Sequence, residues 1–154
     1  MIMPIHTEAV EESGVLDLVW RVFEEFEAPD YSAEGVREFK AFIATEAVKQ
    51  RMCNNELLLW GYFDDEKIVG MIATRPPCHI ALLFVEKEYH RRGIARSLYN
   101  TVLAFYNTNT PCPEITVNSS PYATKIYGRL GFVPTNTEQT VNGLRFTPMK
   151  HILK

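Results

Sequence analysis

A chain of 154 residues, 46% of them hydrophobic, is long enough for one domain with a core and too short for two, so we expect a single domain over residues 1–154. Its net charge of −3 at pH 7 lacks the basic balance of a general nucleic-acid binder. Its longest apolar runs, near 57–63 and 80–85, are far too short to cross a bilayer, so we expect neither a nucleic-acid nor a membrane partner.

The first part of the chain is predicted to form two helices. Apolar residues recur at helical spacing over Val15–Phe26, which predicts a helix that ends before Pro29. Ser32 can cap a second helix, because its side-chain oxygen can accept a hydrogen bond from a free N–H of the first turn. The apolar face of this second helix consists of Val36, Phe39 and Ile43.

Three segments of strand length follow the two helices. Residues Glu56–Phe63 and Ile68–Thr74 flank the turn-forming stretch Asp64–Lys67, which predicts a β-hairpin. His79–Val85 is an apolar run of strand length, and we expect it to be buried on both faces.

Helices and strands alternate in the second half of the chain. Helical spacing begins after Gly93 and continues to Tyr106. Glu114–Asn118 predicts a short strand, and Ser120 is a good N-cap for a helix that ends at Gly131. The inward face of that helix consists of Ala123, Ile126, Tyr127 and Leu130.

The dipeptide Asn142-Gly143 lies between two strand-like segments and is a strong signal for a β-hairpin turn. The predicted element order is therefore β-α-α-β-β-β-α-β-α-β-β. This order predicts an α/β (α+β) domain with a mostly antiparallel sheet and helices on both of its faces.

The cysteines Cys53, Cys78 and Cys112 are widely spaced, and no C-x-x-C or His/Cys spacing links them. The spacing indicates neither a metal site nor a disulfide framework, so we expect three reduced thiols and no metal. The first residues lack the basic-then-apolar pattern of a signal peptide, and we therefore expect a cytoplasmic protein.

Charge is unevenly distributed along the chain. Nine acidic residues and a single basic residue, Arg21, lie between Glu8 and Glu34. Four basic residues gather near the middle: Lys87, Arg91, Arg92 and Arg96. Both segments can be solvated faces, or they can form a basic anchor for an anionic ligand opposite an acidic surface that favours a cationic substrate.

The centre of the chain combines a strand, a short polar loop and a helix, an arrangement that suits an anion. A helix start has free N–H groups and the positive end of the helix dipole. Gly93 and Ala95 allow phosphates to approach the backbone closely. The alternative is an ordinary amphipathic helix with basic surface residues. The loop is neither a Walker motif, which needs G-K-[ST], nor a three-glycine Rossmann fingerprint.

Two segments resemble the signature motifs of the GNAT superfamily of N-acetyltransferases. L-L-F-V-E-K-E-Y-H-R-R-G-I-A-R-S-L is similar to the acetyl-CoA-binding motif, a strand followed by Gln/Arg-x-x-Gly-x-Gly/Ala at a helix start. V-N-S-S-P-Y-A-T-K-I-Y-G-R-L-G-F resembles the second signature of the family. Element order and length agree as well, so the resemblance covers nearly the whole chain. The sequence departs from the motifs at two positions, where His90 replaces Gln/Arg and Ser120 replaces a frequent Asn.

The resemblance implies a binding mode for acetyl-CoA. The central strand would splay from its neighbour, so that the main chain of Leu83, Phe84 and Val85 pairs with the pantetheine arm. Asn118, at the end of the next strand, would lie across that opening. The pyrophosphate would be held mainly by the backbone of Arg91, Arg92, Gly93, Ile94, Ala95 and Arg96.

Acyl transfer to an amine also needs proton transfers. A lysine-like amine with a pKa of about 10.4 is only roughly one part in 10³ neutral near pH 7, so a base helps. Tyr127 matches the family's general acid for the departing thiolate, the alternative being an ordinary core tyrosine. His79 is the candidate base, the alternative being a structural or substrate-contacting histidine. Three acids of the first helix could contact the substrate's ammonium or be merely exposed: Glu24, Glu25 and Glu27.

The resemblance thus implies an N-acetyltransferase that moves an acetyl group from acetyl-CoA to a primary amine of a small molecule or peptide by direct attack in a ternary complex. One alternative is a non-catalytic CoA-binding or sensing module on the same fold. Another is an interaction protein that uses the acidic helices. No motif identifies the acceptor, whose pocket would involve residues 23–32 and 138–145. Family members often pair, which makes a homodimer an expectation.

Overall fold

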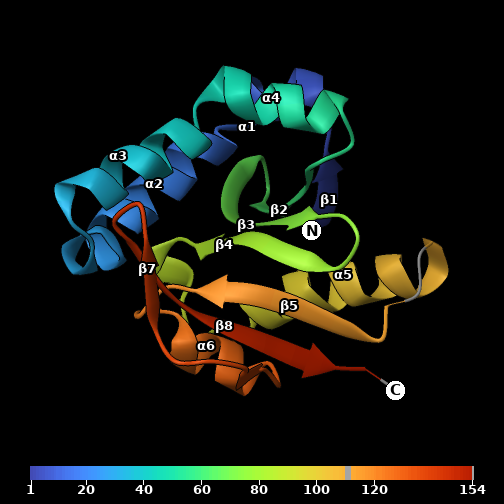
Figure 1. The fold of residues 1–154 in the computed structure, drawn as a ribbon. Coiled ribbons are helices and arrows are strands. Elements are labelled where there is room, and N and C mark those ends of the chain that lie inside the picture. The colour runs from blue at the N-terminus through green and yellow to red at the C-terminus, as the bar shows by residue number, and fades with distance from the viewer. Residues whose placement is uncertain (110–111, 154) are drawn as a thin grey trace.

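The computed structural model describes residues 1–109 and 112–153. Its sheet has the strand order β1-β2-β3-β4-β5-β8-β6, with β7 paired to β8, and every pairing is antiparallel except that of β4 with β5 (Figure 1). The strands are β1 (Ile2–Ile5), β2 (Leu58–Asp64), β3 (Lys67–Arg75), β4 (His79–Val85), β5 (Glu114–Ser119), β6 (Val133–Pro134), β7 (Gln139–Val141) and β8 (Leu144–Ile152).

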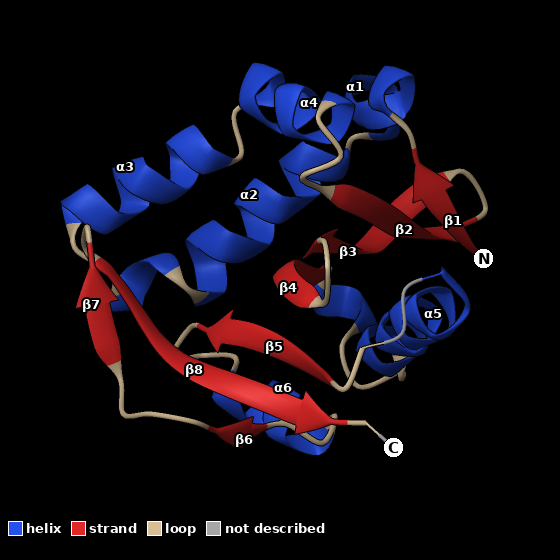
Figure 2. Cartoon of the chain, turned by 45° about the vertical axis from the view of Figure 1, so that its right-hand side comes forward, coloured by secondary structure: helices blue, strands red, loops and turns tan. Residues whose placement is uncertain are grey.

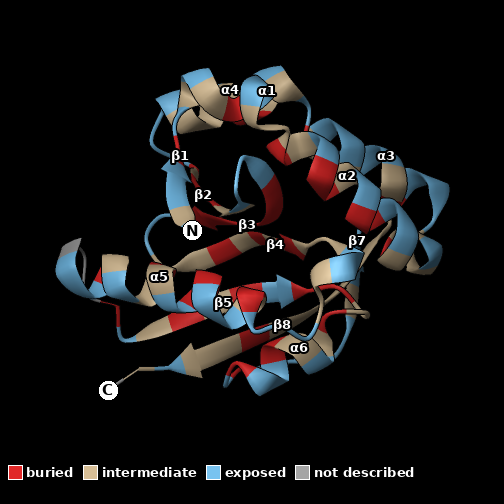
Figure 3. Cartoon of the chain, turned by 180° about the vertical axis from the view of Figure 1, so that it is seen from behind, coloured by how far each residue is buried: buried red, intermediate tan, exposed pale blue. Residues whose placement is uncertain are grey.

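Helices cover both faces of this sheet, as the sequence predicts (Figure 2). The helices are α1 (Val10–Ser13), α2 (Val15–Phe26), α3 (Ala33–Phe42), α4 (Thr45–Cys53), α5 (Ile94–Asn109) and α6 (Thr124–Arg129). One core lies between α1–α4 and the sheet, and a second lies between α5, α6 and the opposite face (Figure 3). Within the described ranges, no helix combines the length and apolarity needed to cross a bilayer.

The predicted helices are confirmed, some with different bounds, and the structure adds α1 and α4, which were not predicted. α2 has the predicted bounds, and the Ser32 hydroxyl caps α3 by accepting a hydrogen bond from the Gly35 N–H at 3.2 Å. The predicted second helix is followed after Ile43 by a separate helix, α4. Residues 121–123 form a turn rather than a first helical turn, so α6 begins at Thr124, although the Ser120 hydroxyl still accepts from the Ala123 N–H at 3.2 Å.

β4 and β5 separate soon after they meet, which confirms the splayed centre of the sheet. They pair only at His79 with Thr116 and at Ile80 with Val117. On its other edge β4 carries one extra residue, because consecutive residues of β3 pair with Ile80 and Leu82. Such a bulge bends a strand locally. Here it coincides with the point where β4 leaves β5.

The expectation that β4 is buried on both faces is wrong. Its residues alternate, with Ile80, Leu82 and Phe84 buried and His79, Ala81, Leu83 and Val85 only half-buried. The half-buried residues line the cavities described below, which occupy the space that a continuous sheet would fill.

The expectation of three reduced thiols is also wrong, because Cys78 and Cys112 form a disulfide with their Cα atoms 6.2 Å apart. Cys53 is free and exposed. The pairing of β4 with β5 brings the two cysteines together, since the Thr116 N–H donates to the Cys78 carbonyl at 3.0 Å. The two cysteines are 34 residues apart, so no local spacing reveals their contact.

Candidate active site

Two cavities lie against β4 and meet at a shared set of residues. The first, which we call the loop cavity, has a volume of about 530 Å³ and is lined by the loop between β4 and α5 and by α6. The second, the hairpin cavity, has a volume of about 400 Å³ and is lined by α3 and the β7–β8 hairpin. We call the residues that line both cavities the junction: Glu27, Leu83, Phe84, Ala123 and Tyr127.

The loop before α5 has the backbone conformation of an anion-binding turn. Arg91 and Gly93 have φ angles of 64° and 79°, while the intervening Arg92 has a negative φ. Alternation of this kind makes neighbouring N–H groups converge into a concave nest. Gly93 accepts a hydrogen bond from the Ser97 N–H at 3.0 Å, so the positive end of the α5 dipole lies beside the loop cavity.

The arginine side chains near this loop have different surroundings. The Arg92 guanidinium lies 4.8 Å from the centre of the Tyr89 ring, and Arg92 does not line the loop cavity. Arg96 lines the cavity and donates to the Arg129 carbonyl at 2.6 Å, which ties α5 to the end of α6. Arg91 is exposed at the cavity. An anion here therefore meets mainly backbone N–H groups and two arginines.

Every second residue of β4 directs its backbone N–H and C=O groups toward the loop cavity. The Glu86 N–H donates to the Val69 carbonyl at 2.8 Å, so Glu86 and Phe84 direct their backbone toward β3. Strand alternation then directs the backbone of Leu83 and Val85 into the gap left by β5. His90 contacts the Val85 carbonyl through Nε2 at 2.7 Å, which ties the loop to the end of β4. Phe84 contributes its ring to the junction rather than free backbone groups.

Tyr127 lies on α6 at the junction, and its side chain is only 5% exposed. Burial, with a smaller contribution from the charge of Glu27, raises the pKa of its phenol, so the hydroxyl holds its proton at neutral pH. Its ring packs edge-on against Phe132 at 5.5 Å. Because Tyr127 lines both cavities, a ligand that spans them would lie beside this residue.

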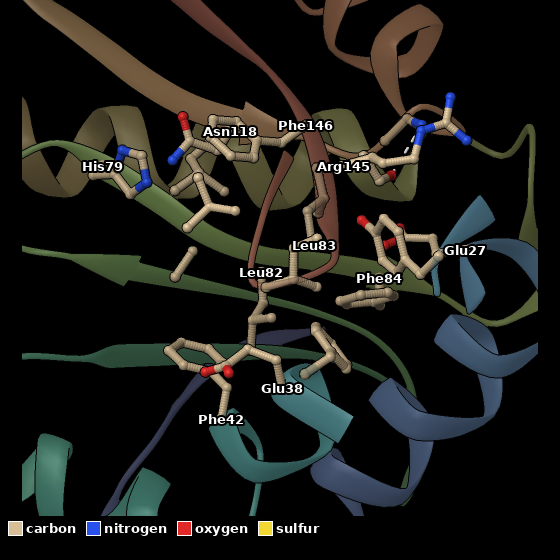
Figure 4. A pocket seen from close by; sticks show the side chains of 18 of the residues that line it. Glu27, Glu38, Phe42, His79, Leu82, Leu83, Phe84, Asn118, Arg145 and Phe146 are labelled. Atoms are coloured by element: carbon tan, nitrogen blue, oxygen red, sulfur yellow. Dashed lines mark hydrogen bonds between the residues drawn. The ribbon is translucent and has the colours of Figure 1, made fainter. Parts of the chain in front are cut away.

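His79 and Asn118 line the hairpin cavity only (Figure 4). His79 Nδ1 lies 2.8 Å from the Thr116 hydroxyl. Burial, and then the charge of Arg75, lowers the pKa of His79 to about 4, so the ring is neutral at pH 7. Asn118 is exposed at the cavity wall and is not part of the loop cavity, where the family resemblance would place it.

Glu27 is the junction residue that the sequence indicated only as one of three acids that could contact the ammonium or be merely exposed. The alternative that it is merely exposed is wrong, because it is only 9% exposed. Burial is the main reason that its pKa is raised to about 7. A hydrogen bond of the Ser120 side chain lowers the pKa to a smaller extent, and the charge of Asp30 raises it. A signal was present, since Glu27 follows Val19 and Phe23 at intervals of four and so continues the inward stripe of α2.

The hairpin cavity combines an aromatic lining with a few polar groups (Figure 4). Besides Phe84 and Tyr127 of the junction, its aromatic residues are Tyr31, Phe39, Phe42 and Phe146. Arg145, on β8, pairs with Glu138 at 2.9 Å and donates to the Asp30 carbonyl at 3.1 Å, which fixes the hairpin to the end of α2. The described residues contain no group of three or more His, Cys, Asp or Glu side chains that could hold a metal.

Comparisons with known proteins identify a family for the chain and solved structures with a similar fold. The family model for the GNAT acetyltransferase domain matches residues 27–153. No curated protein matches the chain in sequence. Among solved structures, the chain is similar to a GCN5-related N-acetyltransferase from Rhodopseudomonas palustris, with 21% identity, a TM-score of 0.81 and coverage of 99% of this chain and 95% of that one.

Two further solved structures have the same fold. The PaiA N-acetyltransferase of Thermoplasma acidophilum, solved in complex with coenzyme A, is 16% identical with a TM-score of 0.82 and coverage of 99% and 98%. A GNAT-family acetyltransferase of Staphylococcus aureus is 16% identical with a TM-score of 0.75 and coverage of 100% and 99%. At these identities the structures support the fold, and the family model supports the membership. The chain belongs to the GNAT family of acetyltransferases.

Proposed function

We propose that the protein is an acetyl-CoA-dependent N-acetyltransferase that acts on a primary amine of a small molecule or peptide. One observation carries the proposal: the loop cavity and the hairpin cavity meet at a buried tyrosine beside the splayed end of β4. A donor in one cavity and an acceptor in the other would bring their reacting atoms together at Tyr127. This geometry suits direct transfer in a ternary complex.

The loop cavity suits the acetyl-CoA donor. The nest at Arg91–Gly93 and the start of α5 would bind the pyrophosphate, with Ile94, Ala95 and Arg96 completing the wall. The backbone groups of Leu83 and the N–H of Val85 face the gap and would pair with the pantetheine arm, as a further strand would, while the Val85 carbonyl contacts His90. The coenzyme A complex of the Thermoplasma acidophilum protein, which shares the fold, supports this assignment.

Tyr127 is the proposed general acid. When the C–S bond of the thioester breaks, the thiolate needs a proton, and a phenol with a raised pKa carries one at neutral pH. An N–H of β4 near Val85 would stabilise the oxyanion of the tetrahedral intermediate. The chemistry needs no metal in this scheme.

The hairpin cavity suits the acceptor amine. Its aromatic walls favour an apolar body, and Glu38 adds negative charge near its opening. His79 and Asn118 at the far wall would contact the part of the acceptor that does not react. His79 is neutral at pH 7, so it remains a candidate proton acceptor for an amine that reaches it.

The test combines binding and turnover. At 100 times its dissociation constant, CoA should stabilise the protein by about 2.7 kcal/mol and raise its Tm by several degrees. Release of the CoA thiol from acetyl-CoA in the presence of an amine panel measures turnover. Turnover of any amine supports the enzyme, stabilisation without turnover favours a CoA-sensing module, and no stabilisation overturns both.

A pair of glycines provides a matched control for the donor site. Gly93 and Gly14 have φ angles of 79° and 76°, and neither has a heavy atom within 4 Å of the place where a Cβ would lie. Gly93→Ala and Gly14→Ala should therefore cause similar backbone strain. Only Gly93→Ala should weaken the stabilisation by CoA, because only Gly93 lines the loop cavity. If CoA stabilised both variants equally, the result would argue against this donor site.

A further inference from the structure

Glu27 is a buried acid without a cationic partner. Among the described residues, the buried polar and charged side chains are Glu27, Thr74, Ser119 and Ser120, so Glu27 is the one carboxylate in this set. The ion pairs of the described part of the chain connect other residues and leave Glu27 out. An isolated carboxylate in such a place destabilises the fold unless a cation or a proton compensates it. A structural role alone does not explain a carboxylate at this position.

The position of Glu27 points to a ligand. It lies directly after α2 and lines both cavities, so that a group at the junction with Tyr127 would meet it. The Ser120 side chain, directly after β5, lies close enough for a hydrogen bond to lower the Glu27 pKa. Phe26, the preceding residue, packs against Tyr122 with ring centres 5.0 Å apart, which holds the end of α2 against α6.

The charged and titratable groups around Glu27 come from three neighbouring elements. Asp30 and Tyr31 follow on the same connection, Tyr122 and Tyr127 lie on the α6 side, and Arg145 reaches toward Asp30 from β8. Arg145 is already paired with Glu138. Its charge therefore does not neutralise Glu27, and the tyrosines hold their protons because burial raises the pKa of each phenol.

We propose that Glu27 receives the acceptor's ammonium group at the junction and takes one of its protons, which makes it the general base of the reaction. The inference rests on the proposed acetyltransferase function and deepens it. The acceptor class follows: a primary amine that arrives charged, attached to an apolar body that fits the aromatic hairpin cavity.

The proposed step balances as follows. Glu27 removes one proton from the ammonium, and the neutral nitrogen attacks the thioester carbonyl, so that a C–N bond forms. The C–S bond then breaks, and the Tyr127 phenol gives its proton to the thiolate sulfur. The second proton lost by the nitrogen restores the Tyr127 phenol, while the proton on Glu27 leaves to solvent. The products are the N-acetyl amide, the CoA thiol and one proton.

The other candidate base is less well placed for the reacting nitrogen. His79 lines the hairpin cavity but not the junction, and Figure 4 shows it at the opposite end of the cavity from Glu27. An amine beside Tyr127 therefore meets Glu27 first. A group with a pKa of about 7 also holds an ammonium proton better than one with a pKa of about 4.

The test compares Glu27→Gln with two control variants. Glu24→Gln changes an exposed acid one turn earlier on α2, and His79→Asn tests the other candidate base. Each protein is assayed for kcat/KM from pH 5.5 to 9.5 and for its Tm shift with CoA. The acceptors are a pair that differs only in amine basicity, 2-phenylethylamine and its 2,2-difluoro analogue, together with the best acceptor of the amine panel.

Glu27→Gln should lower kcat/KM for the basic amine by about 10²- to 10⁴-fold near pH 7 and keep the CoA shift. Its rate should rise tenfold per pH unit as neutral amine accumulates, without the wild-type inflection near pH 7. For the weakly basic fluorinated amine, kcat/KM of Glu27→Gln should fall much less. An active wild type with an unchanged Glu27→Gln profile, or equal losses for both amines, would overturn the inference alone. An inactive wild type would overturn the proposed function as well.

Discussion

The phenol of Tyr127 faces both cavities from a helix face that otherwise packs into the core. Tyr127→Phe removes one oxygen and keeps the ring that packs on Phe132. We expect kcat to fall by about 10²-fold or more, because the thiolate loses its proton donor, while the CoA-induced Tm shift remains. Tyr62→Phe, on β2, is the control and should change neither quantity. Unchanged turnover in Tyr127→Phe would remove this residue from the acid role.

The titration of Glu27 should also change the free energy of unfolding with pH, whether or not the protein is active. The folded protein holds the Glu27 proton up to about pH 7, whereas the unfolded chain releases it near the ordinary value of 4.5. The free energy of unfolding therefore falls as pH rises between these values, by at most about 3 kcal/mol. Glu27→Gln has no carboxyl group to titrate, so its free energy of unfolding should increase relative to that of the wild type between pH 5 and pH 8.

Urea unfolding of both proteins at pH 5 and pH 8 measures this difference. The depressed pKa of His79 acts in the opposite sense, because the unfolded chain binds the proton more readily and stability rises from about pH 4 to pH 6.5. That contribution is common to both proteins and cancels in the comparison. A constant stability difference from pH 5 to pH 8 would contradict the raised pKa of Glu27.

At the scale of elements, the contact between α3 and the β7–β8 hairpin shapes the hairpin cavity. A Cβ on Gly35 would collide with the Gly143 carbonyl group at the tip of the hairpin. The same hairpin carries cavity residues Leu144, Arg145 and Phe146. The two glycines therefore let the turn approach the start of α3 closely enough to close this end of the cavity.

Gly35→Ala should push the hairpin away from α3. We expect the KM for the acceptor amine to rise several-fold and stability to fall by about 1–3 kcal/mol, because the added methyl meets backbone atoms. The CoA-induced Tm shift should not change, since the loop cavity does not include this contact. Glu34→Ala, one residue earlier and exposed, is the control. An unaltered acceptor KM in Gly35→Ala would show that the hairpin does not shape the acceptor site.

At the scale of the whole molecule, the Cys78–Cys112 disulfide joins the connection before β4 to the connection before β5. Closing a loop of 34 residues stabilises a fold by roughly 3–4 kcal/mol through the entropy of the unfolded chain. Dithiothreitol should therefore lower the Tm by several degrees, and Cys78→Ser with Cys112→Ser should abolish that response. Cys53→Ser should keep it. Reaction of the native protein with a thiol reagent should reveal one free thiol, and three would contradict the disulfide.

Local patterns in the sequence were sufficient to predict most of the helices and strands. The bounds of α2 and β4, the Ser32 cap, and the positive φ angles of Asn142 and Gly143 at the hairpin turn all follow from residues within a few positions of each other. The conformation of the loop before α5 is equally local, because a glycine and a helix start create it together. These features were predictable because short-range hydrogen bonding and side-chain spacing decide them.

The arrangement of the site depends on segments that are far apart in the chain. By itself, the sequence determined the types of the main elements, the glycine loop at the start of α5 and the family resemblance. Only the tertiary structure placed Glu27, Leu83 and Tyr127 at one junction, moved Asn118 to the hairpin cavity, and joined Cys78 to Cys112. The physical reason is that these contacts join segments far apart in the chain, as the early parting of β4 from β5 does, whereas local spacing decides only the helices and strands themselves.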